Sequence, residues 1–125
     1  ARIFNYYNYG FKKGFFINDI IKKLKNNKKK INFTNINTYR DFVSMEDINT
    51  GMLKMITLRL MNDYNICSGR KTYLPQVVSF LNKKFNNKII SFDKKVSKSL
   101  YGSNKKLKKK GWNVKNKDFL NELLN

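Results

Sequence analysis

The sequence has no histidine and only one cysteine, Cys67, among its 125 residues. These two absences exclude an intrachain disulfide, a Cys/His zinc site, and any acid–base or triad chemistry that depends on histidine within the chain. No apolar run approaches the roughly 18 residues that a membrane-spanning helix requires. We therefore expect no metal site and no membrane partner.

Acidic residues are also scarce, since 8 Asp and Glu stand against 27 Lys and Arg, for a formal net charge of +19. A chain this basic repels itself at neutral pH unless a polyanion neutralises it. Nucleic acid is the expected partner, because each neutralised phosphate releases condensed counterions. Lys, Asn, Ile, Phe and Tyr make up 70 of the residues, and their AT-rich codons offer a second source for part of the lysine excess.

The first sixteen residues interleave aromatic and basic side chains without a helical or strand period, which predicts an extended arm. Its rings could stack on unpaired bases, or they could belong to a protein core or an edge strand. A short helix is expected from Asp19 to about Asn27, with Asn18 as its cap. The triplet Lys28–Lys30 that follows is either a solvated linker or a phosphate-contacting tail.

Further along the chain, apolar spacing predicts four more helices. Ile36, Tyr39, Phe42 and Val43 suggest one helix, and the pair Ser44 and Asp47 resembles a capping box before a second helix over 52–64. Pro75 suits the first turn of a third helix. The remaining helix would carry Phe92, Val96 and Leu100, whereas the lysine tract at 105–110 has no predicted structure.

The predicted fold class is therefore mostly α, with a small helical core of two to three helices. Residues 1–30 form a basic and aromatic arm with a short helix, residues 31–85 a helical RNA-binding core, and residues 86–125 a basic C-terminal extension. A short terminal helix is expected around Phe119.

No constellation of residues for catalysis is evident, and no catalytic residue is predicted. Adjacent carboxylates such as Glu46 and Asp47 more often match a helix dipole than bind metal. Gly10 and Gly14 lack the third glycine of a dinucleotide-binding loop, so no cofactor is expected. Cys67 is interpreted as structural. One enzymatic alternative stays open, a metal-dependent nuclease fragment using Asp41, Glu46 and Asp47.

The segment from Ile31 to Ser44 resembles the central motif of the bacterial-type small-subunit ribosomal protein eighteen family. Ala1 to Phe4 is similar to the start of that family, and Ile66 to Arg70 followed by Leu74-Pro75 is similar to its end. A rival resemblance, carried by Ser68-Gly69-Arg70 and Lys109 to Trp112, is to the small-subunit ribosomal protein fourteen family. The first resemblance implies a ribosomal RNA partner and contact with small-subunit ribosomal protein six.

The predicted function is thus a non-catalytic structural constituent of the small ribosomal subunit, with no small-molecule substrate. A mitochondrial ribosome is the first choice, and a plastid or the cytoplasm is the alternative. A basic DNA-packaging or membrane-surface protein is another open alternative. The predicted RNA-binding residues are Arg2, Lys12, Lys13, Arg40, Lys54, Arg59, Arg70, Lys71, Lys105, Lys106, Lys108, Lys109 and Lys110.

Overall fold

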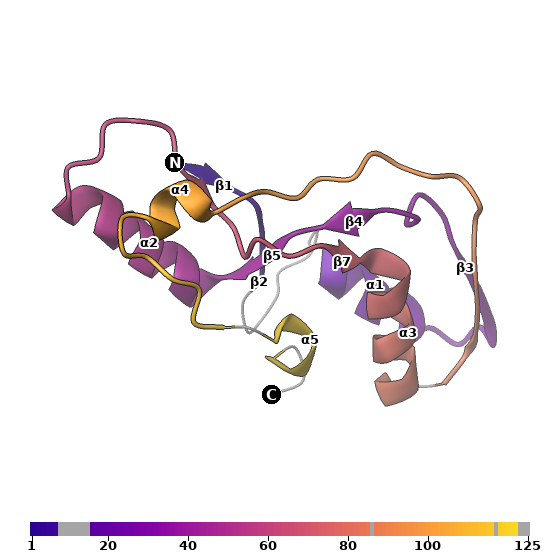
Figure 1. The fold of residues 1–125 in the computed structure, drawn as a ribbon. Coiled ribbons are helices and arrows are strands. Elements are labelled where there is room, and N and C mark those ends of the chain that lie inside the picture. The colour runs from indigo at the N-terminus through magenta and orange to yellow at the C-terminus, as the bar shows by residue number, and fades with distance from the viewer. Residues whose placement is uncertain (8–15, 86, 117, 123–125) are drawn as a thin grey trace. The chain divides into compact units, whose positions relative to one another are not determined.

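The computed structural model describes residues 1–7, 16–85, 87–116 and 118–122. The helices in these ranges, labelled in Figure 1, are α1 (Phe16–Leu24), α2 (Met45–Thr57), α3 (Leu74–Phe85), α4 (Lys105–Lys108) and α5 (Phe119–Glu122). The strands are β1 (Arg2–Ile3), β2 (Asn5–Tyr7), β3 (Lys30–Phe33), β4 (Tyr39–Arg40), β5 (Phe42–Ser44), β6 (Asn65–Ile66), β7 (Thr72–Tyr73) and β8 (Ile89–Phe92).

Three of the strand pairs are parallel, and β4 also pairs with β7. β1 pairs with β6, β2 with β5 and β3 with β8, with Arg2 opposite Asn65, Asn5 opposite Phe42 and Lys30 opposite Ile89. Parallel pairing needs long crossover connections, which here contain helices, and this arrangement defines the α/β class. The prediction of a mostly α fold is therefore wrong.

The chain divides into two compact units. Unit 1 consists of residues 1–8, 40–71 and 100–125, and unit 2 consists of residues 9–39 and 72–99. Each unit thus combines segments that are far apart in the sequence. Neither unit follows the three consecutive segments expected from the sequence.

Unit 1 has a core of apolar side chains from its middle and last segments. Its buried members are Val43, Ile48, Tyr64, Ile66, Leu107 and Trp112. Gly51 lets α2 approach this core closely, because a Cβ at that position would lie 3.3 Å from the side chains of Ile66 and Trp112. All three residues of β5 are buried, as is usual for a strand of a parallel pair.

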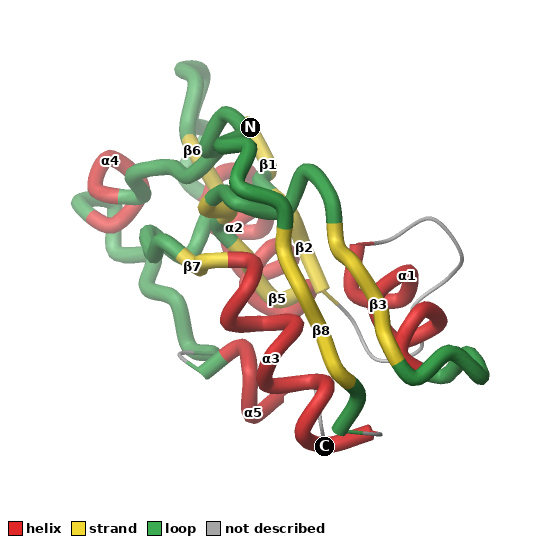
Figure 2. The backbone as a smooth tube through the Cα atoms, turned by 90° about the vertical axis from the view of Figure 1, so that its right-hand side faces the viewer, coloured by secondary structure: helices red, strands yellow, loops and turns green. Residues whose placement is uncertain are grey.

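Unit 2 packs two amphipathic helices and one strand pair. Ile17, Ile20 and Leu24 form the buried stripe of α1, and Val77, Val78 and Leu81 are fully buried in α3. Residues spaced three or four apart share a helix face, which explains the packing of α1 against α3. Figure 2 shows β3 and β8 side by side.

Two predicted helices are wrong. Tyr39–Arg40 and Phe42–Ser44 are strands, and the segment expected to carry Phe92, Val96 and Leu100 forms the end of β8 and then an extended chain. Apolar residues three and four apart led to the helical interpretation, but in short buried segments such spacing does not separate strand from helix.

The described part of the predicted arm forms two short strands. Residues 2–3 and 5–7 lie in β1 and β2, and the side chain of Tyr7 is buried. The rest of the arm, including Lys12 and Lys13, lies outside the described residues. At the other end of the chain, the lysine tract contains α4, which is anchored by the fully buried Leu107.

Candidate functional site

A buried carboxylate organises the loop after β6. Asp41 is fully buried and accepts hydrogen bonds from the backbone N–H groups of Ser68 at 2.7 Å and Gly69 at 2.9 Å. Gly69 has a φ of +78°, a region that disfavours side chains with a Cβ. The amide of Asn104 donates to the carbonyl oxygens of Cys67 and Ser68. The loop therefore has a fixed conformation.

The thiol of Cys67 lies inside this arrangement and is fully buried. Burial, with the negative charge of Asp41 as a second cause, raises the pKa of Cys67 to about 12, although a hydrogen bond from the Gly69 backbone opposes the shift. The thiolate is the reactive form of cysteine. A structural role for Cys67, as predicted from the sequence, agrees with these surroundings.

A second buried carboxylate, Asp47, joins the start of α2 to the C-terminal segment. The Ser44 hydroxyl caps α2 by accepting from the Asp47 backbone N–H at 3.0 Å, which confirms the predicted capping interaction. The Asp47 carboxylate accepts from the backbone N–H groups of Lys115 at 2.8 Å and Asn116 at 3.2 Å. Both buried aspartates thus accept hydrogen bonds from backbone N–H groups.

These contacts remove the basis of the nuclease alternative. Asp41 and Asp47 are occupied by separate backbone groups, and the Glu46 side chain lies 3.9 Å from the Lys115 ammonium. Among the residues that the structure describes, no group of three or more His, Cys, Asp or Glu could hold a metal ion. No described helix is long and apolar enough to cross a membrane.

Arg40 is the one arginine of the four that is partly buried. Its backbone is held by Leu100, because Arg40 bridges to Leu100 and the next residue, Asp41, donates its N–H to the Leu100 carbonyl at 3.2 Å. The strand that contains Arg40, β4, also pairs with β7. The bridge fixes the point from which the Arg40 side chain extends, and a guanidinium can bind two oxygens through its planar fork.

The other three arginines are exposed. Arg2 forms an exposed ion pair with Asp63 at 3.0 Å, Arg59 follows α2, and Arg70 belongs to the loop after β6. Exposed pairs of this kind contribute little to stability.

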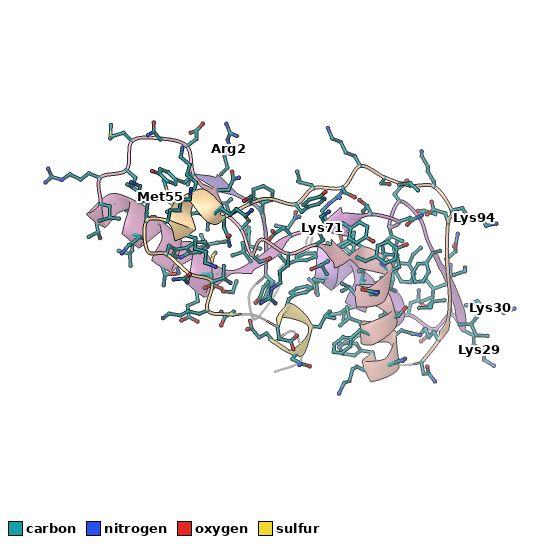
Figure 3. The ribbon with its side chains drawn as sticks, in the orientation of Figure 1. Arg2, Lys29, Lys30, Met55, Lys71 and Lys94 are labelled. Carbon is teal, nitrogen blue, oxygen red and sulfur yellow. The ribbon has the colours of Figure 1, made fainter. Side chains whose placement is uncertain are left out.

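The predicted lysine contacts of unit 1 are dispersed over several elements. The Lys71 ammonium lies 4.2 Å from the ring centre of Tyr101, and the Lys106 ammonium lies 4.6 Å from the ring centre of Tyr64. Figure 3 labels Lys71 and, on another element, Arg2. Lys54 lies in the last turn of α2. The remaining predicted lysines lie in or just after α4, namely Lys105, Lys108, Lys109 and Lys110.

Arg70 and Lys108 line the same pocket in unit 1, which has a volume of about 310 Å³. Its other lining residues are Ser68, Gly69, Asn104, Trp112, Asn113 and Val114. The two cations are far apart in the sequence, so only the folded chain shows this pairing.

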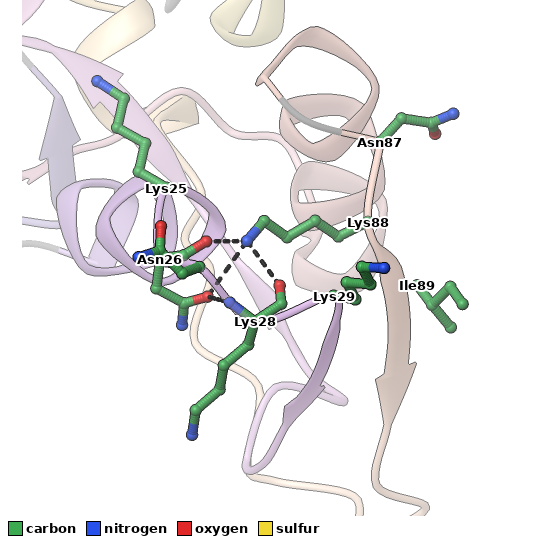
Figure 4. A pocket seen from close by; sticks show the side chains of 8 residues that line it. Lys25, Asn26, Lys28, Lys29, Asn87, Lys88 and Ile89 are labelled. Atoms are coloured by element: carbon green, nitrogen blue, oxygen red, sulfur yellow. Dashed lines mark hydrogen bonds between the residues drawn. The ribbon is translucent and has the colours of Figure 1, made fainter.

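Unit 2 has a larger pocket, of about 540 Å³, that sequence reasoning missed. Figure 4 shows its lining: Lys25, Asn26, Asn27, Lys28, Lys29, Asn87, Lys88 and Ile89. The lysine run Lys28–Lys30, interpreted from the sequence as a solvated linker or a phosphate-contacting tail, supplies part of one wall of this pocket. Nothing in the sequence pointed to Lys88, which the β3–β8 pairing brings to the other wall.

The fold is shared with NAD-dependent epimerase and dehydratase enzymes. RMD from Pseudomonas aeruginosa, solved with NADPH, matches with a TM-score of 0.78 and 20% identity over 98% of this chain and 43% of that one. The UDP-N-acetylglucosamine 4-epimerase from Bacillus cereus matches with 0.71 and 17% identity over 96% and 41%. MoeE5, solved with UDP-glucose and NAD, matches with 0.75 and 16% identity over 98% and 43%.

The described residues therefore form a Rossmann-like α/β fold, and the chain spans less than half the length of these solved structures. No family model matches the sequence. No curated protein sequence matches it either.

These similarities correct the functional predictions. The resemblance to ribosomal protein families is contradicted, because the structural neighbours are epimerase and dehydratase enzymes. The predicted ribosomal function and the predicted partners, ribosomal RNA and small-subunit ribosomal protein six, are contradicted as well. The nuclease and DNA-packaging alternatives are unsupported. The predictions of a non-catalytic protein and of no small-molecule substrate are contradicted for the same reason. A mitochondrial location stays a prediction.

Proposed function

We propose that this chain supplies the nucleotide-sugar-binding part of an enzyme of the epimerase and dehydratase type. The observation that carries the proposal is the fold, which nearly the whole chain shares with proteins such as UDP-N-acetylglucosamine 4-epimerase and MoeE5 in its complex with UDP-glucose and NAD. A nucleotide sugar presents a diphosphate, two sugars and a base, and the diphosphate requires cationic partners.

The sequence does not contain a dinucleotide-binding loop. Its six glycines, at positions 10, 14, 51, 69, 102 and 111, do not form the Gly-x-Gly-x-x-Gly pattern that lets a backbone approach a pyrophosphate. The chain's own residues therefore do not fit a complete dinucleotide cofactor site. The proposal concerns the sugar-nucleotide substrate, and no chemical step is assigned to this chain.

Arg40 is the residue that we assign to the diphosphate. It is partly buried, its backbone is fixed by the bridge to Leu100, and the adjacent Asp41 is anchored to the loop after β6. An arginine fork binds phosphate oxygens in a bidentate manner, and partial burial strengthens the contact because water screens it less. A lysine at this position would keep the charge and lose the fork.

The test is titration of the 125-residue chain with UDP-glucose and with UDP, and binding is measured by saturation-transfer NMR and calorimetry. We expect binding, with affinity reduced about tenfold or more in Arg40→Gln and partly retained in Arg40→Lys, in line with the energy of a charge-assisted bidentate pair. Arg59→Gln removes the same charge from an exposed position in unit 1 and is the matched control. No binding of UDP-glucose or UDP, or equal loss in both glutamine variants, would refute the proposal.

A further inference from the structure

Unit 2 carries most of the net positive charge of the molecule. It holds fourteen lysines and two aspartates, with no arginine and no glutamate, whereas unit 1 holds the remaining nine lysines, all four arginines and six acidic residues. Figure 3 shows the side chains of Lys29, Lys30 and Lys94 extending away from the ribbon of unit 2. This charge is not spread evenly, because four lysines line the pocket of unit 2.

The two walls of this pocket are tied together by one of these lysines. The ammonium of Lys88 donates to the backbone carbonyl and the side-chain oxygen of Asn26, and to the backbone carbonyl of Lys28 at 2.7 Å (Figure 4). Lys88 is partly buried, unlike the three other lysines of the lining. Its three N–H groups thus connect two segments that are sixty residues apart.

The wall that carries Lys88 is itself anchored in the interior. The side-chain amide of Asn82, which is 5% exposed, donates to the Lys88 carbonyl at 2.7 Å and accepts from the Lys88 N–H at 2.9 Å. On the opposite wall, the Asn26 side chain accepts from the Lys28 N–H at 3.0 Å. The chain's own hydrogen bonds therefore hold the backbone around the pocket, which lowers the entropic cost of binding a ligand.

Among the described lining residues there is no carboxylate. The Lys88 ammonium donates to Asn26 and Lys28, and the Lys25 ammonium lies 5.4 Å from the centre of the Phe85 ring. Both aspartates of unit 2 lie elsewhere: Asp93 accepts from the Asn35 N–H at 3.0 Å, and Asp19 lies in the first turn of α1. Like charges close together repel one another, and a bound anion relieves that repulsion. Lys28 and Lys29 are exposed at the rim, and the amides of Asn27 and Asn87 add donors.

We propose that this pocket binds a small oligoanion, a molecule that carries two or more linked phosphate groups. Several ammonium groups with few competing carboxylates favour a multiply charged ligand over chloride or a single carboxylate. The pocket volume lies within the range of small-molecule sites. The proposal is independent of the nucleotide-sugar function assigned to unit 1, because it rests on other residues.

The bland alternative is that the lysines accumulated through AT-rich codons and are simply solvated. In that case only the total charge matters, and any two exposed lysines of unit 2 are equivalent. The double variant Lys28→Gln/Lys29→Gln and the matched double variant Lys94→Gln/Lys95→Gln separate the two cases. Both remove two positive charges from exposed positions of unit 2, but only the first pair lines the pocket.

The experiment is calorimetric titration of the 125-residue chain and both variants with sodium tripolyphosphate at low ionic strength, with circular dichroism as the check of folding. We expect Lys28→Gln/Lys29→Gln to weaken binding about tenfold or more, and Lys94→Gln/Lys95→Gln to weaken it less than about threefold. Amide NMR shifts are expected at residues 26–29 and 87–89.

Three results would overturn the proposal. Equal losses in the two double variants would show a diffuse charge effect, and shifts spread over all lysine-bearing segments would show the same. Absence of tripolyphosphate binding, or binding of long nucleic acid alone, would show that the pocket is not a small-molecule site. Should the pocket variant fail to fold, the NMR shifts of the unaltered chain still decide between a local and a diffuse site.

Discussion

Unit 1 and unit 2 handle charge in opposite ways. Unit 1 buries the carboxylates of Asp41 and Asp47 and uses them to hold four backbone N–H groups. In unit 2, Asp19 is exposed and Asp93 is only partly buried, and the pocket is held by the amide of Asn82 and the ammonium of Lys88. The net charge of +19 therefore describes neither unit by itself. Unit 1 is organised by buried carboxylates, whereas unit 2 exposes most of its lysines.

The largest expected effect concerns Cys67 in the interior of unit 1. Because its pKa is raised from 9.0 to about 12, the thiolate population at a given pH below 9 falls by roughly three orders of magnitude. Alkylation by iodoacetamide should therefore be much slower in the folded chain than in concentrated urea. Mass spectrometry of the alkylated chain over time measures the rates. Comparable rates in both states would show that the interior of unit 1 is open.

The same thiol links stability to pH. The unfolded thiol ionises near pH 9 and the folded one near 12, so the unfolded chain binds fewer protons between these values and the stability of unit 1 falls as pH rises through this window. Cys67→Ala should remove that component. The difference between the two unfolding curves, measured as a function of pH, isolates the contribution of Cys67.

The next effect compares two aspartates. Asp47→Ala leaves the N–H groups of Lys115 and Asn116 without their acceptor and uncouples the C-terminal segment from α2, which should cost about 3 kcal/mol. Asp19→Ala in unit 2 removes an exposed carboxylate from the first turn of α1 and should cost under about 1 kcal/mol. Urea unfolding measures both values. Similar losses of unfolding free energy in the two variants would show that the buried and the exposed aspartate stabilise the chain equally.

The smallest effect is the response to salt. Raising sodium chloride from low to physiological ionic strength should stabilise unit 2 by about 1 kcal/mol, because fourteen lysines repel one another across its surface. Unit 1 should gain less, since its charges are more balanced. Hydrogen exchange followed by segment, 72–85 against 45–57, reports the two units separately. A larger gain in unit 1 would contradict the charge assignment.

Several local features were predictable from the sequence, because short-range chemistry determines them. The cap of α2 follows from Ser44 and Asp47, and the position of Pro75 in the first turn of α3 follows from its missing N–H. The strands β4 and β5 were missed because they are two and three residues long, and buried parallel strands lack the alternation that identifies a strand.

The candidate sites were less accessible to sequence reasoning. Arg40 was among the predicted phosphate contacts, but its fixed backbone depends on Leu100, sixty residues away. Lys88 reaches Asn26 and Lys28 only through the pairing of β3 with β8. The functional prediction failed because net charge, counted over the whole chain, was taken as a sign of nucleic acid binding, although most of the lysines belong to one unit of an α/β fold.

The discontinuity of unit 1 determines the order in which the chain can fold. The Tyr7 hydroxyl donates to Glu122, 115 residues later, and the Phe119 ring stacks on Phe42 at 4.3 Å. During synthesis, every residue of unit 2 has been added by position 99, whereas unit 1 must wait for its last segment. Contacts this distant in the sequence form slowly. The nascent chain therefore exposes β2 and β5 until α5 is made, and this interval is when it is most prone to aggregate.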